Sequence, residues 1–248
     1  MTIQDKFAEA AFWDKVASQR VYAAFDEQEY RDVFERALGN SLENRTVIDI
    51  GSASGVSAAI LAASGAKVIG VDISPELIKQ AQNLWSDYVD RIDFMVGDAE
   101  HLDLPDASVD ACFFGGVLHH FPDRADVYAE AFRILKPGGK FIALEPNRLD
   151  VFERIEWTIA DWRGKLSPNE YPIDPIAMKV ELESAGFTRP RFTTMRRDIP
   201  LLAQLPLLRR FFGRQKGFKL KRPLLRFFDA MRAPECRGTF FVIDAQRP

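Results

Sequence analysis

Short apolar runs alternate with helical stretches from residue 46 to about residue 145, and this alternation is the strongest constraint on the fold. Five runs are expected to be strands: Thr46–Ile50, Lys67–Val71, Ile92–Val96, Ala111–Gly116 and Lys140–Leu144. The stretches between them that are expected to be helices are Val56–Ser64, Pro75–Trp85 and Ala125–Leu135. Because the strands lack polar alternation, helices should cover both faces of the sheet. The pattern predicts an α/β fold with a doubly wound, mostly parallel sheet.

The flanking segments complete one expected domain over residues 1–248, with a core at 46–145. Residues 1–45 are expected to form a helical cap whose apolar stripe packs over the sheet edge or over a ligand. A turn at Pro137–Gly139 should lead into the fifth strand, and an insertion should follow it at 146–173. The remaining expected elements are a helix at Met178–Ala185 and strands at Phe187–Met195 and Thr239–Ala245, which make seven strands. Residues 196–238 are far too long for a hairpin link and are expected to be a second insertion.

The net charge of −3 hides an uneven distribution. Residues 1–188 carry a net charge of −14, whereas residues 189–237 hold 14 basic and 3 acidic residues. Within that basic segment, residues 199–230 alternate Leu and Phe clusters with Lys and Arg clusters. This composition favours contact with an anionic membrane surface. A lid over the active site and an ordinary packed cap with solvated charges are the alternatives. Nucleic acid is a less favoured partner, because basic residues fit it but the bulky aliphatic residues do not.

Apolar residues make up 47% of the chain, which excludes wholesale disorder. The two cysteines, Cys112 and Cys236, are too few for a disulfide framework and lack metal-ligand spacing, so a reducing compartment is expected. The first ten residues do not resemble a signal peptide, and no run reaches the roughly 18 apolar residues of a membrane span. We therefore expect a cytoplasmic protein, with peripheral membrane association through residues 199–230 as a further prediction.

The first strand runs into a glycine-rich turn and then a helix, with Asp49, Gly51, Ser52 and Gly55 around the turn. Such a turn lets the backbone approach a ligand, and the helix start offers unpaired N–H groups. Dinucleotide-binding domains have a similar loop, so the turn alone does not identify the ligand. Asp72 ends the second strand roughly 20 residues later, where a carboxylate can bind a ribose.

Three further segments follow the later strands in order: Asp98-Ala99 after the third, Gly115 to His120 after the fourth, and Leu135 to Lys140 before the fifth. Together with the first two, these segments resemble the class I S-adenosylmethionine-dependent methyltransferases. The similarity is greatest to the small-molecule group that includes ubiquinone and menaquinone biosynthesis methyltransferases. It covers roughly residues 46–145. Ala53 departs from the family pattern, in which a glycine is usual at this place.

The resemblance implies a seven-stranded Rossmann-like fold and S-adenosylmethionine as the cofactor, with S-adenosylhomocysteine as the product. Asp49, Gly51, Ser52, Gly55 and Gly115 would surround the methionine portion. Asp72 would accept hydrogen bonds from the ribose hydroxyls, with Ile73 packed on the adenine. Asp98 and the Ala99 N–H would meet polar atoms of the adenine. Two of these acidic residues have a simpler alternative, since Asp98 could cap a turn and Asp72 could start a helix.

The acceptor is expected to be a small or lipid-linked molecule that is methylated on oxygen or carbon. Alignment and exclusion of water are the main requirements, and a base is needed only if the acceptor loses a proton. His119, His120 and Glu145 are the candidate catalytic residues, while one histidine could instead orient the loop. Asn147 and Tyr171 are further candidates for the acceptor pocket. The three histidines of the chain show no metal-ligand spacing, so no metal site is expected.

Two other functions remain open. A binding module that kept the fold and lost the chemistry would have the same cofactor motifs. A nucleic-acid methyltransferase is less favoured, because Gly115–Leu118 occupies the place of the Asn/Asp-Pro-Pro-aromatic turn used for methylating amino groups of adenine or glutamine. A nicotinamide-dependent dehydrogenase fits least, since the Asp98-Ala99 and Leu118–His120 segments are foreign to that class.

Overall fold

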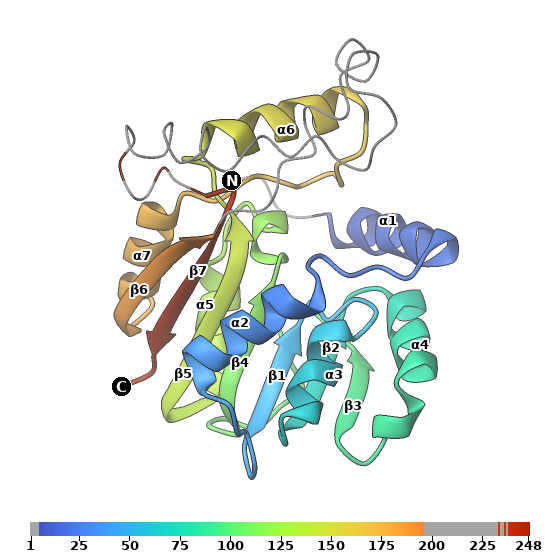
Figure 1. Ribbon diagram of the computed structural model, residues 1–248, viewed down its shortest axis with the longest axis vertical. Helices are drawn as coiled ribbons and strands as arrows, with labels where there is room; N and C mark the ends of the chain where they lie inside the picture. Colours follow the sequence, from blue (N-terminus) through green and yellow to red (C-terminus); the bar gives the residue numbers. More distant parts are fainter. Residues whose placement is uncertain (1–4, 196–232, 234–235, 237) are drawn as a thin grey trace.

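The computed structural model describes residues 5–195, 233, 236 and 238–248 of the chain. In this part of the chain, strands form one seven-stranded sheet in the order β3-β2-β1-β4-β5-β7-β6 (Figure 1). The strands are β1 Thr46–Ile50, β2 Lys67–Asp72, β3 Ile92–Val96, β4 Val109–Gly115, β5 Leu135–Pro146, β6 Thr188–Met195 and β7 Phe240–Gln246. Strands β1 to β5 pair in parallel, and β7 runs antiparallel to both β5 and β6. The predicted doubly wound, mostly parallel sheet is confirmed.

The fifth strand differs from its prediction. It begins at Leu135 rather than Lys140, so the Pro137–Gly139 segment lies inside the strand. Leu135 pairs with Val109 and Lys140 pairs with Ala111, with an irregular register between them. The expected turn is thus an irregular segment within the strand, at the point where the register with β4 shifts. For each of the other strands, the predicted first and last residues lie within about two residues of the observed ones.

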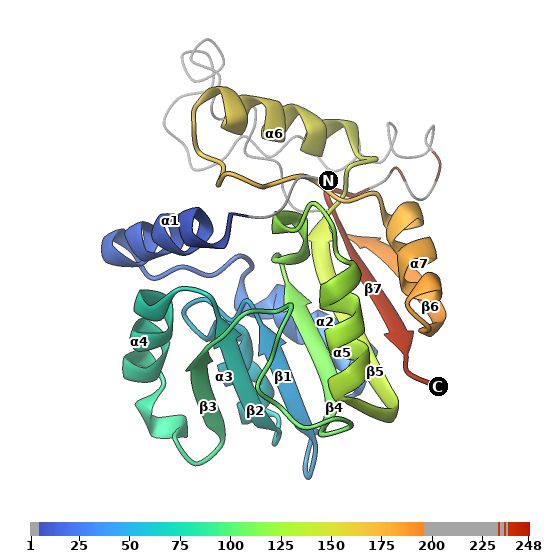
Figure 2. The ribbon, with the colours of Figure 1, turned by 180° about the vertical axis from the view of Figure 1, so that it is seen from behind.

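The helices are α1 Lys6–Gln19, α2 Glu27–Leu38, α3 Val56–Ala63, α4 Pro75–Leu84, α5 Ala125–Ile134, α6 Val151–Trp162 and α7 Pro175–Ser184, with short 3₁₀ turns η1 Ser86–Tyr88 and η2 Leu118–His120. One buried cluster joins α2, α3 and α4 to the sheet, and a second joins α5 and α7 to its other face (Figure 2). The central strands β1 and β4 are almost fully buried because both faces are covered, as their continuous apolar runs predict.

Local sequence signals explain where the helices begin. Asp26 and Glu29 form a reciprocal capping box at the start of α2. Ser74 caps α4 directly before Pro75, and Asp174 caps α7 directly before Pro175. Because Asp174 caps it, α7 begins at Pro175, three residues before the predicted start at Met178.

Two helices lie beyond the carboxyl ends of the parallel strands, above that edge of the sheet in Figure 1: α1 from the predicted cap and α6 from the predicted insertion at 146–173. Of α1, only Glu9 is buried, which sets this helix apart from the core helices. The insertion is therefore helical at α6 and then extended up to α7, in agreement with the predicted helical insertion.

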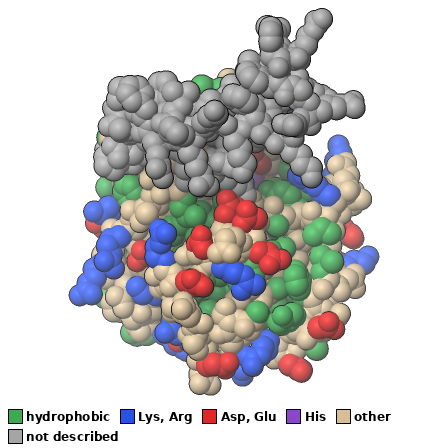
Figure 3. All heavy atoms as spheres, in the orientation of Figure 1, with side chains coloured by type: hydrophobic (Ala, Val, Ile, Leu, Met, Phe, Trp, Pro, Cys, Tyr) green, Lys and Arg blue, Asp and Glu red, His purple; other side chains and the backbone are tan. Residues whose placement is uncertain are grey.

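The predicted basic insertion at 196–238, including the membrane-binding segment 199–230, lies almost entirely outside the described residues. On the face in Figure 3, basic and acidic side chains of described residues are interspersed. Among the helices of the described part, none combines the length and apolar character needed to cross a membrane.

Candidate active site

The glycine-rich turn after β1 has a backbone that requires small residues. Gly51, Ala53 and Gly55 have φ values of 72°, 48° and 82°, so all three lie in the left-handed region. A Cβ on Gly51 would lie 2.6 Å from Val117 Cγ2, and one on Gly55 would lie 2.6 Å from Phe94 Cζ. Ala53, the departure from the family pattern, therefore occupies a conformation that glycine adopts at lower cost.

Asp72 connects the end of β2 to this turn. Its Oδ2 accepts a hydrogen bond from the Ala53 N–H at 2.9 Å, and its Oδ1 accepts one from the Ser74 N–H at 2.9 Å. Burial raises the pKa of Asp72 to about 6, although these N–H donors act in the opposite direction. Asp72 is therefore a carboxylate of fixed orientation whose remaining lone pairs face the cavity that it lines.

Asp49 is buried behind the turn. Its Oδ2 accepts from the Ser57 hydroxyl at 2.6 Å, while its Oδ1 has no hydrogen-bond partner. Burial raises the pKa of Asp49 to about 7, and the negative charge of Asp72 adds to the increase. Ser52 also keeps a buried hydroxyl without a partner. Unsatisfied buried polar atoms are costly, so these two atoms point to a polar ligand at the turn.

A cavity opens at the carboxyl ends of the strands, and a few polar groups converge on its mostly apolar lining, as in small-molecule sites. Seven of the nine predicted cofactor residues line it: Gly51, Ser52, Asp72, Ile73, Asp98, Ala99 and Gly115. The two others, Asp49 and Gly55, lie behind the wall and shape it. The strand order brings these residues together although they are spread over about 65 positions of the sequence.

Helix α1 closes one side of the cavity. Glu9 and Trp13 line it, and Trp13 packs against Tyr22 with ring centroids 4.8 Å apart. The Lys6 ammonium pairs with Asp98 at 2.5 Å and also with Glu100. The sequence predicted a cap over the sheet edge or a ligand, but it did not single out Glu9 or Lys6. No periodic or spacing signal marks them, because their partners are about 90 or more residues away.

Beyond the fourth strand, Glu145 organises the turn that holds the two histidines. This carboxylate is fully buried at the end of β5 and accepts from the N–H groups of Val117 and Leu118 at 3.0 and 2.8 Å. Its other oxygen lies 2.7 Å from His119 Nδ1. Glu145 therefore fixes both the backbone of η2 and the ring of His119, but this candidate catalytic residue is not among the residues that line the cavity.

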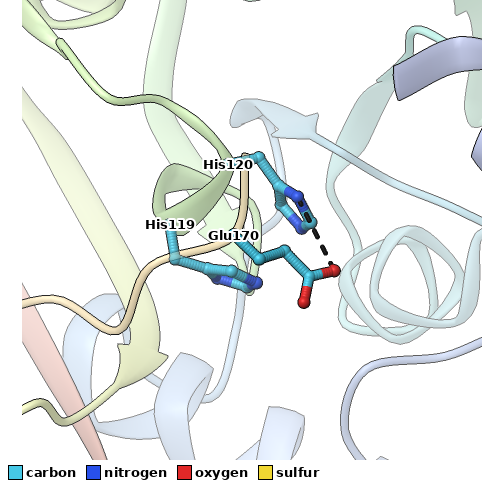
Figure 4. A group of neighbouring side chains, drawn as sticks. All are labelled: His119, His120 and Glu170. Carbon is cyan, nitrogen blue, oxygen red and sulfur yellow. Dashed lines mark ion pairs between the residues drawn. The ribbon is translucent and has the colours of Figure 1, made fainter. Parts of the chain in front are cut away.

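His120 is buried and does line the cavity. Its Nδ1 lies 2.9 Å from Glu9 Oε1, 3.0 Å from Ser167 Oγ and 3.9 Å from Glu170 Oε1. The rings of His119 and His120 are 4.2 Å apart between centroids, and Glu170 lies next to both (Figure 4). Sequence reasoning found the histidines but missed Glu9, Ser167 and Glu170.

The environment of the two missed glutamates affects their pKa values in opposite directions. Burial raises the pKa of Glu9, but hydrogen bonding to His120 and its charge outweigh burial, and the net pKa is lowered. Burial dominates at Glu170, whose pKa is raised. Glu9 therefore remains a carboxylate next to His120 at neutral pH.

The other two predicted pocket residues do not line the cavity. Asn147 donates from Nδ2 to the Gly238 carbonyl at 3.0 Å and is fully buried, so it holds the end of β5 to the start of β7. Tyr171 is mostly exposed, and its backbone N–H donates to the His119 carbonyl at 2.9 Å. Asn147 supports the site through its side chain, and Tyr171 supports it through its backbone.

Comparison with known proteins agrees with this geometry. Residues 48–143 match the model of the methyltransferase domain family. Over these residues the chain is therefore similar to a methyltransferase domain. A probable S-adenosylmethionine-dependent methyltransferase of Mycolicibacterium smegmatis is 30% identical over 138 residues, which cover 54% of this chain and 52% of that protein. The predicted resemblance, and with it the cofactor of the family, is confirmed.

One further relative and one solved structure are similar to a larger part of the chain. A ubiquinone biosynthesis O-methyltransferase of Xanthomonas oryzae is 29% identical over 167 residues, covering 66% of this chain and 69% of that protein. A methyltransferase of Haloferax volcanii, solved in a complex with the Trm112 methyltransferase activator, superposes with a TM-score of 0.68 at 21% identity and covers both chains fully. This likeness shows the fold. The chain spans about half the length of the first curated relatives that it matches.

Proposed function

We propose that this protein transfers a methyl group from S-adenosylmethionine to a small-molecule or lipid-linked acceptor, on oxygen or carbon. The observation that supports the proposal most is the cavity itself. It combines the strand-end residues assigned to the cofactor with His120 and Glu9, which belong to a separate polar cluster. A donor site and a group of titratable side chains thus share one cavity.

The residues present fit the cofactor. Asp72 offers an oriented carboxylate for a diol, and the unpartnered Ser52 hydroxyl and Asp49 Oδ1 offer polar contacts beside the glycine turn. Gly51 and Gly115 have no space for a side chain, because a Cβ would lie 2.6 Å from Val117 at the first and 2.9 Å from Phe113 at the second. The backbone at both positions is therefore free to approach the cofactor closely. The bound cofactor supplies an activated methyl group on a sulfonium.

The chain's own residues provide alignment and exclusion of water. Trp13, Tyr22 and Phe121 line the cavity together with the polar residues, so the reacting atoms would be held in a largely apolar enclosure. Glu145 keeps η2 in place through two backbone hydrogen bonds, which sets the position of His120 on the wall. Glu9 meets His120 from the opposite helix. An acceptor that loses a proton on reaction would meet this histidine–carboxylate cluster.

The relatives that support an oxygen or carbon acceptor include a ubiquinone biosynthesis O-methyltransferase and a ubiquinone/menaquinone biosynthesis C-methyltransferase. Contact with an anionic membrane through residues 199–230 is part of the proposal and rests on the sequence alone. It predicts binding to anionic liposomes at low salt that is lost when residues 199–230 are deleted.

The test of the activity uses the purified full chain and isotope-labelled S-adenosylmethionine. Calorimetry should show cofactor binding, and mass spectrometry of an incubated cell extract should show label in a lipid or small-molecule fraction. Binding without labelled product in any fraction would support a non-catalytic binding module instead. Label found only in RNA or DNA would support a nucleic-acid methyltransferase and would contradict the proposed acceptor class.

A further inference from the structure

The two histidines and Glu170 form a compact group of metal-ligating atoms next to the cavity. One ligand atom from each of His119, His120 and Glu170 lies within 4.8 Å of the other two (Figure 4). No sequence spacing reveals this set, because Glu170 comes about fifty residues after the histidines. The two segments meet only in the folded chain.

The backbone holds these segments against each other. The Tyr171 N–H donates to the His119 carbonyl at 2.9 Å, directly beside Glu170. Two residues further on, the Ile173 N–H donates to the Pro146 carbonyl at 3.0 Å, and Ile173 forms a bridge with Asn147. The segment after α6 is therefore fixed to both η2 and the end of β5. A ligand set on tied backbones keeps its geometry before an ion arrives.

A carboxylate oxygen also lies within hydrogen-bond distance of Nδ1 in each imidazole. Glu145 lies 2.7 Å from His119 Nδ1, and Glu9 lies 2.9 Å from His120 Nδ1. Histidines that bind metals usually donate one ring N–H to a carboxylate, which fixes the tautomer and increases the basicity of the other nitrogen. Glu145 is itself held by two backbone N–H groups. Glu145 is thus an outer partner for a metal-binding His119, and Glu9 takes the same place at His120 when its Nε2 binds the ion.

The cluster holds more carboxylates than imidazoles, so its net charge favours a bound cation. Three carboxylates surround the two imidazoles, and the side chains of Glu9, Glu145 and Glu170 are 3%, 0% and 10% exposed. Buried carboxylates need compensation by a cation or by hydrogen bonds. Glu9 Oε2 is buried and has no hydrogen-bond partner. Lys6, on the same helix as Glu9, pairs with Asp98 and Glu100 instead.

We propose that His119, His120 and Glu170 bind one divalent transition-metal ion of the Zn²⁺ class, with a coordination position open toward the cavity. Two imidazoles and a carboxylate are a ligand set that suits Zn²⁺ or Co²⁺, and three protein ligands with an open position are typical of catalytic sites. The histidines then act as ligands rather than as the proton acceptors considered from the sequence. A cation at this place lowers the pKa of an acceptor hydroxyl that reaches it. That role rests on the proposed methyl transfer, whereas ion binding itself does not.

The test measures the ion directly. The full chain is freed of metal with a chelator and titrated with Co²⁺, which reports imidazole and carboxylate ligation by its visible absorption, and then with Zn²⁺ in competition with a chromophoric chelator. We expect about one ion per chain. Glu170→Gln should weaken Zn²⁺ binding roughly 100-fold, and Glu9→Gln, which changes an outer partner, roughly 10-fold. His101→Gln and Glu183→Gln alter an exposed histidine and an exposed glutamate elsewhere and should have no effect.

The outcomes separate this site from the proposed function. Retention of the wild-type Zn²⁺ affinity by Glu170→Gln, or absence of saturable Co²⁺ absorption in the wild type, would overturn the metal site while leaving cofactor binding unaffected. Metal binding without any affinity for S-adenosylmethionine would overturn the proposed function and leave the metal site standing. Circular dichroism of each variant confirms that it is folded. Should Glu170→Gln fail to fold, the result for Glu9→Gln decides.

Discussion

The two sides of the cavity are built in different ways. The donor side consists of turns at the ends of four neighbouring parallel strands, so residues that follow one another in sequence order also meet in space. The other side is assembled from α1, η2 and the segment around Glu170, which come from three distant parts of the chain. The first side is determined by a local pattern repeated in every strand–helix unit. The second depends on how irregular segments pack over the sheet.

This difference separates binding from chemistry. The side that binds the methyl donor has few carboxylates, and the main one, Asp72, accepts hydrogen bonds from backbone N–H groups. The opposite side has three carboxylates and two histidines in mutual contact. Changes on the donor side should therefore alter cofactor affinity, and changes on the other side should alter stability and acceptor activation.

The largest effect is expected at Asp72. Replacing it with alanine removes an oriented carboxylate and should weaken S-adenosylmethionine binding by about 3 to 4 kcal/mol, or 100-fold or more, because charged hydrogen bonds are worth about 1.5–3 kcal/mol each. Calorimetric titration measures the change. Asp72→Asn should fall between alanine and wild type, and Asp90→Ala, an exposed aspartate after η1, should match wild type. An unchanged affinity in Asp72→Ala would show that the cofactor is placed wrongly.

On the opposite side, Glu145→Ala should mainly affect stability. Three donors, the N–H groups of Val117 and Leu118 and the His119 ring, lose a buried acceptor. Leaving buried donors unpaired should lower the free energy of unfolding by about 2 to 3 kcal/mol, measured by urea denaturation. Glu145→Gln keeps an oxygen acceptor and should lose less. If cofactor affinity fell as much as in Asp72→Ala, the two sides would not be separable.

The pH dependence comes from the donor side. Asp49 and Asp72 have pKa values raised to about 7 and about 6 by burial, so both take up protons as the pH falls through this range. The cofactor carries a sulfonium and an ammonium, so its affinity should fall roughly 10- to 100-fold between about pH 8 and pH 5.5. The free protein should respond with the opposite sign. Its folded state binds protons that the unfolded state lacks, so these two groups stabilise it at lower pH and destabilise it as the pH rises through 6 to 7.

Calorimetry in buffers of different ionisation enthalpy measures proton release on cofactor binding, which should be positive near pH 6. Asp49→Asn removes one titrating group and should flatten the profile. A profile that is flat in the wild type would mean that the two carboxylates are already ionised without the cofactor.

The same division explains how much of the molecule could be predicted from its sequence. Asp49, Gly51, Asp72, Asp98 and Gly115 could be placed at one edge of the sheet because each stands at the end of an apolar run, whereas their roles toward the cofactor follow from the resemblance to the methyltransferases. Glu9 and Glu170 could not be found in this way. Glu9 is a single buried residue on a mostly exposed helix, and Glu170 belongs to an irregular segment. Their importance arises from contacts with His120, which no local periodicity encodes.

The smallest predicted effect tests the one departure from the family pattern on the donor side. Ala53 has a φ of 48°, and an alanine in this region is strained by about 1 kcal/mol relative to glycine. Ala53→Gly removes that strain but adds entropy to the unfolded chain, so a net gain of about 0.5 kcal/mol in the free energy of unfolding is expected. The Ala53 N–H also donates to Asp72, and glycine keeps this hydrogen bond. Cofactor affinity should therefore change by less than about twofold. A lower stability in Ala53→Gly would mean that the methyl group makes contacts worth more than the strain, and the turn would then have adapted to alanine.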